Sequence, residues 1–257
     1  MDSNAVLRSM SHDMDAMMRD SPNAHLRIDD GGWLGLSGEK GFADLNMAMV
    51  FRSGGPVLLQ EYLREINDRE LQAVLIVEAD SPEVEQAAVD EGLMPAGQMP
   101  IMVWEGKPAP VGEARFKMRL GTERDLPVVL RLASEAFSMD EEKLRRVFSP
   151  SALSSALSRG LDIWIAEDTS GPVGLGMFVA SDDHVGIYTM STPAPHQRRG
   201  IGRAVLDAGM AHHLDRGATT FTLGATEAGF HLYEQTGFEV VGKPSIYVIG
   251  MSTQFSS

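Results

Sequence analysis

Hydrophobic and polar positions along the chain switch between the period of a strand and the period of a helix. In residues 115–120 apolar and polar side chains alternate, which is typical of a strand with one buried face. In residues 201–216 the apolar positions Ile201, Val205, Ala208, Ala211 and Leu214 recur every three or four residues. This spacing predicts an amphipathic helix. The mixture of both periods along the chain predicts an α/β protein.

The second half of the sequence has a regular order of expected elements. After the strand at 115–120, Thr122 with Asp125 three residues later predicts the start of a helix, and a second helical region ends at Gly160. The remaining expected elements are strands at 162–168, 172–181 and 184–192, the helix at 201–216, a strand at 218–225, a helix at 227–236 and a last strand at 238–250.

The first half has a similar but less regular order. An N-terminal helix is followed by strands at 33–38 and 43–51, a helix at 56–68, a strand at 71–79, a helix at 82–91 and a strand at 93–104. Two prolines and two glycines in residues 105–114 indicate a boundary. We therefore expect two domains, residues 1–112 and residues 113–257.

The ends of the two halves resemble each other. Gly92 and Gly97 have the same spacing as Gly237 and Gly242, and a proline follows the second glycine in both segments. Because the element order agrees as well, we interpret the two segments as a weak internal repeat. Chance similarity between two turns that join a helix to a strand is the alternative.

Composition restricts the partners of the protein. The 257 residues are 43 % hydrophobic and 23 % charged, as in an ordinary globular protein, and the formal net charge is −14. This acidity argues against nucleic acid and an anionic membrane as partners. No apolar run reaches the roughly 18 residues that would cross a bilayer, and the acidic start is unlike a signal peptide. We therefore expect a cytoplasmic protein.

The charge is uneven along the chain, and one residue type is missing. Residues 1–112 contain 8 of the 22 Lys and Arg residues but 19 of the 36 Asp and Glu residues, so the second half is relatively rich in cations. An anionic ligand is therefore expected there. The sequence has no cysteine, which excludes disulfides, thiolate metal sites and a cysteine nucleophile.

One segment of the second half is suited to phosphate. Gly200 and Gly202 open the helix predicted from residue 201, where unsatisfied backbone N–H groups and the helix dipole attract anions. Arg198, Arg199 and Arg203 add positive charge. The P-loop pattern is absent, and the dinucleotide fingerprint fails at Val205. An ordinary turn with two glycines is the alternative.

The segment GIYTMSTPAPHQRRGIGRAVL resembles the acetyl-CoA-binding motif of the GNAT family of N-acetyltransferases, [QR]-x-x-G-x-[GA]. Gln197, Gly200 and Gly202 match that signature, and LYEQTGF at residues 232–238 resembles the C-terminal motif of the family. The order of elements over residues 113–250 also agrees. The resemblance implies a GNAT-like fold with a mixed sheet, and by analogy with tandem members it implies a degenerate GNAT-like first half without either motif.

The resemblance also implies roles for individual residues. The pyrophosphate of acetyl-CoA is expected on the amides of Arg198, Arg199, Gly200, Ile201, Gly202 and Arg203, and the pantetheine arm is expected along Met190, Ser191 and Thr192. The strand that carries the latter residues must part from its neighbour to admit the thioester. A backbone amide near Met190 is our candidate oxyanion donor. Tyr233 occupies the position of the general acid.

Three departures from the family pattern leave questions. Two prolines, Pro193 and Pro195, surround Ala194 where one is common; Gly186 stands near the place of a frequent catalytic glutamate; and Thr226 replaces a cofactor-contacting asparagine. The general base is therefore open among Asp182, Asp183, His184, Glu135 and a water chain. His212 and His213 are adjacent and lack the spacing of a zinc pair, so no metal is expected.

The expected function is transfer of an acetyl group from acetyl-CoA to a primary amine by direct attack in a ternary complex. The acceptor is a small molecule or a peptide, and the chain is a monomer or a homodimer. A non-catalytic acyl-CoA-binding sensor or interaction module is the alternative, since the missing glutamate would permit loss of turnover. A third hypothesis is a cleft for another phosphorylated ligand.

Overall fold

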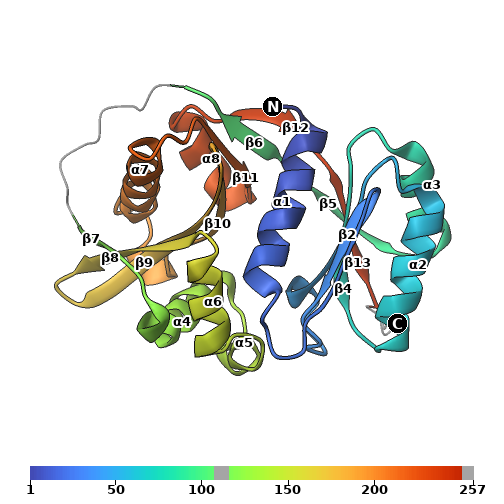
Figure 1. Ribbon diagram of the computed structural model, residues 1–257, viewed down its shortest axis with the longest axis horizontal. Coiled ribbons are helices and arrows are strands. Elements are labelled where there is room, and N and C mark those ends of the chain that lie inside the picture. The colour runs from blue at the N-terminus through green and yellow to red at the C-terminus, as the bar shows by residue number, and fades with distance from the viewer. Residues whose placement is uncertain (107–115, 251–257) are drawn as a thin grey trace. The chain divides into compact units, whose positions relative to one another are not determined.

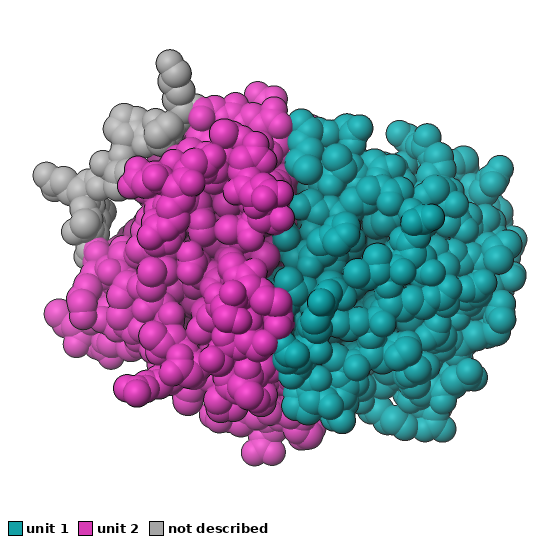
Figure 2. Space-filling model, viewed as in Figure 1, with its two compact units in different colours: residues 1–100, 242–257 teal, residues 101–241 magenta. Residues whose placement is uncertain are grey.

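The computed structural model describes residues 1–106 and 116–250. The chain forms two compact units, one made of residues 1–100 with 242–257 and one made of residues 101–241 (Figure 2). Each unit contains a mixed sheet with helices packed against it, so the expected α/β class is confirmed. The expected domain boundary after residue 112 lies outside the described residues and stays a prediction.

Unit 1 is built on a six-stranded sheet (Figure 1). The strands, in spatial order, are β1 (His25–Asp29), β2 (Gly32–Leu36), β3 (Asn46–Val50), β4 (Ala73–Val77), β13 (Ser245–Ile249) and β5 (Met94–Gln98). Only the pair β3–β4 is parallel among these described strands. The helices are α1 (Ser3–Met18), α2 (Gly55–Asp68) and α3 (Pro82–Asp90), with a 3₁₀ turn η1 at Ala43–Leu45.

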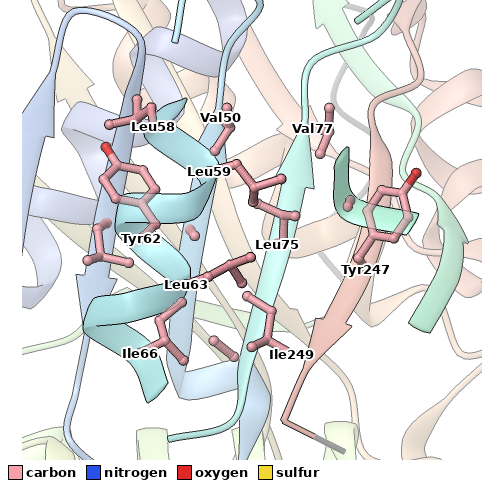
Figure 3. Close-up of a cluster of buried hydrophobic side chains, with 14 of the residues drawn as sticks. Val50, Leu58, Leu59, Tyr62, Leu63, Ile66, Leu75, Val77, Tyr247 and Ile249 are labelled. Atoms are coloured by element: carbon pink, nitrogen blue, oxygen red, sulfur yellow. The ribbon is translucent and has the colours of Figure 1, made fainter. Parts of the chain in front are cut away.

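The core of unit 1 lies between this sheet and helices α2 and α3 (Figure 3). Helix α2 buries Leu59, Tyr62 and Ile66, which recur at helical spacing on one face. Strand β4 adds Leu75 and Val77 at strand spacing. The last strand of the chain, β13, contributes Tyr247 and Ile249 to the same cluster, so this core needs the C-terminal end of the sequence.

Unit 2 is built on a seven-stranded sheet. The strands, in spatial order, are β12 (Glu239–Gly242), β6 (Ile101–Trp104), β11 (Thr220–Gly224), β10 (His184–Ser191), β9 (Gly171–Ser181), β8 (Leu161–Asp168) and β7 (Lys117–Leu120). The helices are α4 (Leu126–Phe137), α5 (Glu141–Val147), α6 (Pro150–Ser158), α7 (Ile201–Leu214) and α8 (Glu227–Gln235), with 3₁₀ turns η2 at Glu123–Asp125 and η3 at Ala194–His196. Figure 1 shows α7 and α8 on one side of this sheet and α4 to α6 on the other.

The helix start predicted at Thr122 is confirmed by its hydrogen bonds. Thr122 and Asp125 form the reciprocal capping box, with the Asp125 carboxylate accepting from the Thr122 amide at 2.9 Å. Arg119 donates to the same carboxylate at 2.7 Å and to Glu167 at 2.6 Å. The hydrogen bond from Arg119 is the largest cause of the lowered pKa of Asp125, so the cap stays ionised near neutral pH.

Two sequence segments supply one strand to each sheet. Single strands were expected at 93–104 and 238–250, and both predictions are wrong. Each segment is interrupted near a proline, Pro100 or Pro244, which cannot donate a ladder hydrogen bond. Strands β5 and β13 belong to the sheet of unit 1, whereas β6 and β12 belong to the sheet of unit 2. The two segments that resemble each other in sequence therefore take corresponding positions. Each contributes its first strand, β5 or β12, to the edge of one sheet and its second strand, β6 or β13, to the interior of the other.

Truncation of the chain before β13 tests whether unit 1 needs this strand. A chain that ends at Val241 lacks β13, and we expect unit 1 not to reach its native fold. The sheet would lose the strand between β4 and β5, and the core would lose Tyr247 and Ile249, each worth about 1.5–3 kcal/mol by burial. Hydrogen exchange of amides in α2 and β4 should become fast. A chain ending at Gly250 is the matched control and should stay protected; protection of β4 in the shorter chain would contradict the account.

Candidate active site

Strand β10 parts from its parallel neighbour β11 before it reaches the glycine loop. Within the described strands, the pairing of these two runs from His184 opposite Thr220 to Gly186 opposite Thr222 and includes no later residue of β10. Strand β11 continues to Gly224 and stays paired there with β6. The sheet therefore opens along residues 187–191, as the expected binding of a pantetheine arm requires.

A bulge accompanies this separation. The register of β10 with β9 shifts between Tyr188 and Ser191, where three steps along β10 face two steps along β9. Thr189 lies in this bulge with φ of 48°, a left-handed conformation that is unfavourable for a β-branched residue. Met190, Ser191 and Thr192, the residues predicted to meet the pantetheine arm, belong to the bulge and the residues that follow it.

The loop after β10 presents its backbone amides at the start of α7. Arg198 and Gly200 have φ values of 62° and 87°, and no heavy atom lies within 4 Å of where a Cβ of Gly200 would be. The amide of Ala204 donates to the Gly200 carbonyl, so the amides of Ile201, Gly202 and Arg203 precede the first intrahelical bond. Unsatisfied donors at the positive end of a helix suit a phosphate group.

Glycines in β9 let α7 approach the sheet closely at this end. A Cβ on Gly174 would lie 2.5 Å from Ile201 and 3.0 Å from the Ser191 carbonyl oxygen, and a Cβ on Gly176 would lie 2.4 Å from the sulfur of Met190. Sequence reasoning did not assign these glycines a role. Their spacing of two residues places both on the same face of β9, which is the available signal for close packing.

The side chains of the loop are engaged in different contacts. Gln197 donates from its amide to the Thr192 carbonyl at 3.1 Å, which closes the loop on itself. Arg199 pairs with Asp168 at 2.7 Å and Arg203 with Asp207 at 2.7 Å. Asp168 and Asp207 were not identified from the sequence; Asp207 stands four residues after Arg203, a spacing that could have shown it.

Tyr233 lies on α8, close to the start of α7. Its ring packs against Phe238 at 5.9 Å between centroids, and the side chain is 6 % exposed. The neighbouring Leu232 would lie 3.3 Å from a Cβ on Gly202, so α8 and the glycine loop are adjacent. Burial raises the pKa of Tyr233 to about 12, and its phenol is therefore protonated at neutral pH and able to donate. Thr226 caps α8 by accepting from the Gly229 amide at 3.2 Å.

The titratable candidates for the general base lie elsewhere. His184 begins β10, and its ring is bonded to the Thr222 hydroxyl at 2.8 Å. Six residues of strand separate it from Met190, or about 20 Å at the usual rise per residue. Burial lowers the pKa of His184. Asp183 accepts from the amide and the hydroxyl of Thr219 at the same far end of β10.

Two other candidates, Asp182 and Glu135, are exposed. Asp182 is exposed in the same turn and has a φ of 52°. Glu135 is exposed on α4 and pairs with Arg131 of the same helix at 3.3 Å. The contacts of the described side chains assign the base to none of these residues, and Glu135 and a water chain stay open.

His212 and His213 lie together at the opposite end of α7. Both rings approach one oxygen of Asp162, at 3.2 and 3.6 Å. Burial lowers the pKa of His213, which is 3 % exposed. In residues 1–106 and 116–250 no group of three or more His, Asp or Glu side chains has a metal-binding arrangement. None of the described helices has the length and apolar character to cross a membrane.

Unit 1 has a parallel strand pair, β3–β4, that corresponds to β10–β11 of unit 2, but its two strands do not separate. The parallel pair β3–β4 runs from Met47 opposite Val74 to Val50 opposite Val77, and the Glu78 amide extends it by donating to the Val50 carbonyl. The Glu78 carboxylate, on a buried residue, accepts from the Arg52 amide of the following loop at 2.7 Å. A carboxylate therefore occupies one backbone donor of the loop between β3 and α2.

Part of unit 2 matches a known family model. Residues 159–240 match the family model described as "Acetyltransferase (GNAT) domain". A stretch of 58 residues is 38 % identical to mycothiol acetyltransferase of Propionibacterium freudenreichii subsp. shermanii, covering 21 % of this chain and 19 % of that protein. The matched region thus spans about a fifth of this curated relative.

Solved structures resemble nearly the full chain. A GCN5-related N-acetyltransferase from Kribbella flavida has a TM-score of 0.65 at 14 % identity, covering 95 % of this chain and 94 % of that one. A tandem GNAT protein from the clavulanic acid biosynthesis pathway has a TM-score of 0.62 at 12 % identity, covering 95 % and 91 %. These low identities establish a shared fold.

Residues 159–240, within unit 2, resemble the GNAT acetyltransferase domain. The chain has the fold of solved GNAT N-acetyltransferases over nearly its full length. The expected GNAT-like fold is confirmed, and the structure of unit 1 is consistent with a degenerate GNAT-like half. The individual site residues stay predictions.

Substitution of Gly202 tests the loop. We expect Gly202→Val to abolish binding of acetyl-CoA while the protein stays folded, because the branched side chain would crowd the amides at the start of α7. Gly202→Ala is the matched control: its Cβ meets only the flexible end of Leu232 at 3.3 Å, and binding should persist. Calorimetry measures affinity and circular dichroism measures folding. Unchanged affinity in the valine variant would refute the loop assignment.

Proposed function

We propose that this protein transfers an acetyl group from acetyl-CoA to a primary amine of a small molecule or peptide. The observation that carries the proposal is the opening between β10 and β11, which ends at a loop with free amides at the start of α7. An extended thioester can pair with β10 where β11 has left it, while its diphosphate meets the loop. A cytoplasmic location remains part of the proposal.

Direct attack in a ternary complex is the simplest reaction for a chain without cysteine. The nitrogen of the neutral amine forms a bond to the acetyl carbon, and the carbonyl oxygen gains negative charge. The amide of Met190, in the bulge of β10, is the proposed donor to that oxygen. The carbon–sulfur bond then breaks, Tyr233 gives its proton to the departing thiolate, and the proton released by the amine restores the phenol through solvent.

The environment of Tyr233 supports its role as a proton donor. A phenol with a pKa of about 12 keeps its proton at neutral pH and up to the pH of about 10.4 at which a typical primary amine is half neutral. Because the amine must lose a proton without an identified protein base, turnover should depend on the fraction of neutral acceptor. Thr192 and Gln197, which are joined by a hydrogen bond, would line the cofactor site together with Thr226. Thr226 stands where many members of the GNAT family have an asparagine.

A non-catalytic acyl-CoA sensor is the second candidate, and one observation favours it. Gly186 stands where a base is frequent, and the nearby His184 is held by Thr222 far from the opening. Release of CoA with any amine would exclude the sensor.

The proposed acceptors are small amines and peptide N-termini. The mycothiol acetyltransferase that matches a short region of this chain bears the name of a small-molecule thiol, which makes small amines the first compounds to screen. Peptide N-termini are the next class. A monomer and a homodimer both fit the proposal.

Replacement of Tyr233 by phenylalanine tests the general acid. We expect turnover to fall about 100-fold, the order of magnitude that a positioned proton donor supplies, with the affinity for acetyl-CoA changed less than about twofold. Tyr247→Phe is the matched control, because Tyr247 is equally buried but lies in the sheet of unit 1. Equal loss of turnover and of affinity in Tyr233→Phe would remove its assignment as the acid.

A further inference from the structure

Unit 1 contains a pocket where the ends of three strands meet the first turn of α3. Its walls come from the segment that follows β4, from the first turn of α3, from the last residue of β5 and from the residues just before β13. Ser245 is paired with both Val77 and Gln98, which keeps the ends of β4, β13 and β5 level. The pocket has a volume of about 700 Å³, within the range of pockets that hold small molecules.

Side chains of both charges line this pocket. Asp80 and Glu85 contribute carboxylates, Lys243 contributes an ammonium group and Gln98 contributes a neutral amide. Among the described residues, the side chains of Asp80, Gln98 and Lys243 have no hydrogen bond and no ion pair. Lys243 therefore shares the pocket with two carboxylates without being paired to either of them.

The Glu85 carboxylate has a defined position in the wall. Ser245 donates its hydroxyl to Oε1 of Glu85 at 2.6 Å, and the Glu85 side chain is half-buried. The other carboxylate oxygen has no partner among the described residues. A carboxylate that is held in this way loses little conformational freedom when it binds a ligand.

Two buried hydroxyl groups beside the pocket lack partners. Ser81 lies between two lining residues, Asp80 and Pro82, and is 2 % exposed. Ser3 packs against the lining residue Gly242, with its Oγ 2.1 Å from where a Cβ of that glycine would be. Neither hydroxyl has a hydrogen-bond partner among the described residues. Native structures leave few buried polar groups unsatisfied, so two beside one pocket favour a polar ligand there.

The charges of the pocket select the class of ligand. A phosphate would face the carboxylates of Asp80 and Glu85, and a simple cation would face Lys243, so either ion meets a like charge. One molecule that carries an ammonium group and a carboxylate matches both sides.

We propose that unit 1 binds a small zwitterion of the amino-acid class in this pocket. Its ammonium group meets Asp80 and Glu85, and its carboxylate meets Lys243 and Gln98. These residues all belong to unit 1, and the proposal does not depend on the proposed acetyl transfer.

The test begins with a thermal-shift screen of the full chain without acetyl-CoA. The probes are the standard amino acids and a series of ω-amino acids from β-alanine to 6-aminohexanoate, which varies the distance between the two charges. A ligand that binds the folded state raises the melting temperature. The strongest binder is then titrated by calorimetry, together with its amide, which lacks the carboxylate, and its N-acetyl derivative, which lacks the ammonium group.

We expect at least one probe to bind, and each derivative to bind about tenfold more weakly, because each loses one charge-assisted contact. Lys243→Gln and Asp80→Asn should each weaken the parent zwitterion about tenfold as well. Asparagine tolerates the left-handed backbone of Asp80, at a φ of 57°, so the turn should be retained. Lys243→Gln should change binding of the amide little, and Asp80→Asn should change binding of the N-acetyl derivative little, since the partner group is already absent.

Matched controls remove the same charges elsewhere in unit 1. Asp90→Asn lies at the last residue of α3, and Lys40→Gln removes a lysine outside the pocket. Both variants should bind the parent zwitterion as the wild type does, and circular dichroism checks that every variant is folded. The proposal is overturned if no probe stabilises the wild type, or if both derivatives bind as tightly as the parent. Unchanged binding in Lys243→Gln and Asp80→Asn would also overturn it, because the zwitterion would then bind outside this pocket.

Discussion

Strand β10 leaves its parallel neighbour β11 after Gly186, and the properties of the candidate site depend on this separation. Parallel strands normally continue their ladder, so the residues from Ile187 to Ser191 give up hydrogen bonds to β11. The bulge at Thr189 turns β10 away, and the close approach of Ile201 to Gly174 holds the start of α7 behind it. Backbone groups that would be satisfied in a regular sheet are thereby available to an extended ligand.

Unit 1 shows what the same order of elements gives without that separation. Its parallel pair is continuous to the ends of both strands, and Glu78 adds a backbone hydrogen bond to Val50 and a carboxylate that accepts from the Arg52 amide. The hydrophobic packing of β4 with α2 and α3 is preserved. A duplicated fold can therefore keep its core while one copy loses the irregularity on which ligand binding depends, because the core and the opening involve different residues.

Much of the fold could be predicted from the sequence, because local patterns determine it. The period of Ile201 to Leu214 predicted α7, and the Thr122 capping box predicted the start of the helical region of unit 2. The loop could be proposed from Gln197, Gly200 and Gly202 because its residue types match a known signature. Each of these signals lies within one short stretch of chain.

What could not be predicted depends on contacts between distant residues. The assignment of β6 and β13 to different sheets follows from pairing partners more than 100 positions away, which alternation cannot reveal. The pairing of Asp168 with Arg199 and the bond of His184 to Thr222 are likewise long-range. His184 was therefore a reasonable candidate for the base by residue type, although the strand direction puts it far from the opening.

The central claim is that one unit of this chain binds an acyl-CoA and the other does not. A calorimetric titration of the whole protein with acetyl-CoA tests it most directly, with ATP as a control for general phosphate affinity. We expect micromolar binding at one site per chain and much weaker binding of ATP. Two sites per chain would contradict the closed loop of unit 1, and no binding would contradict the assignment of the opening in unit 2.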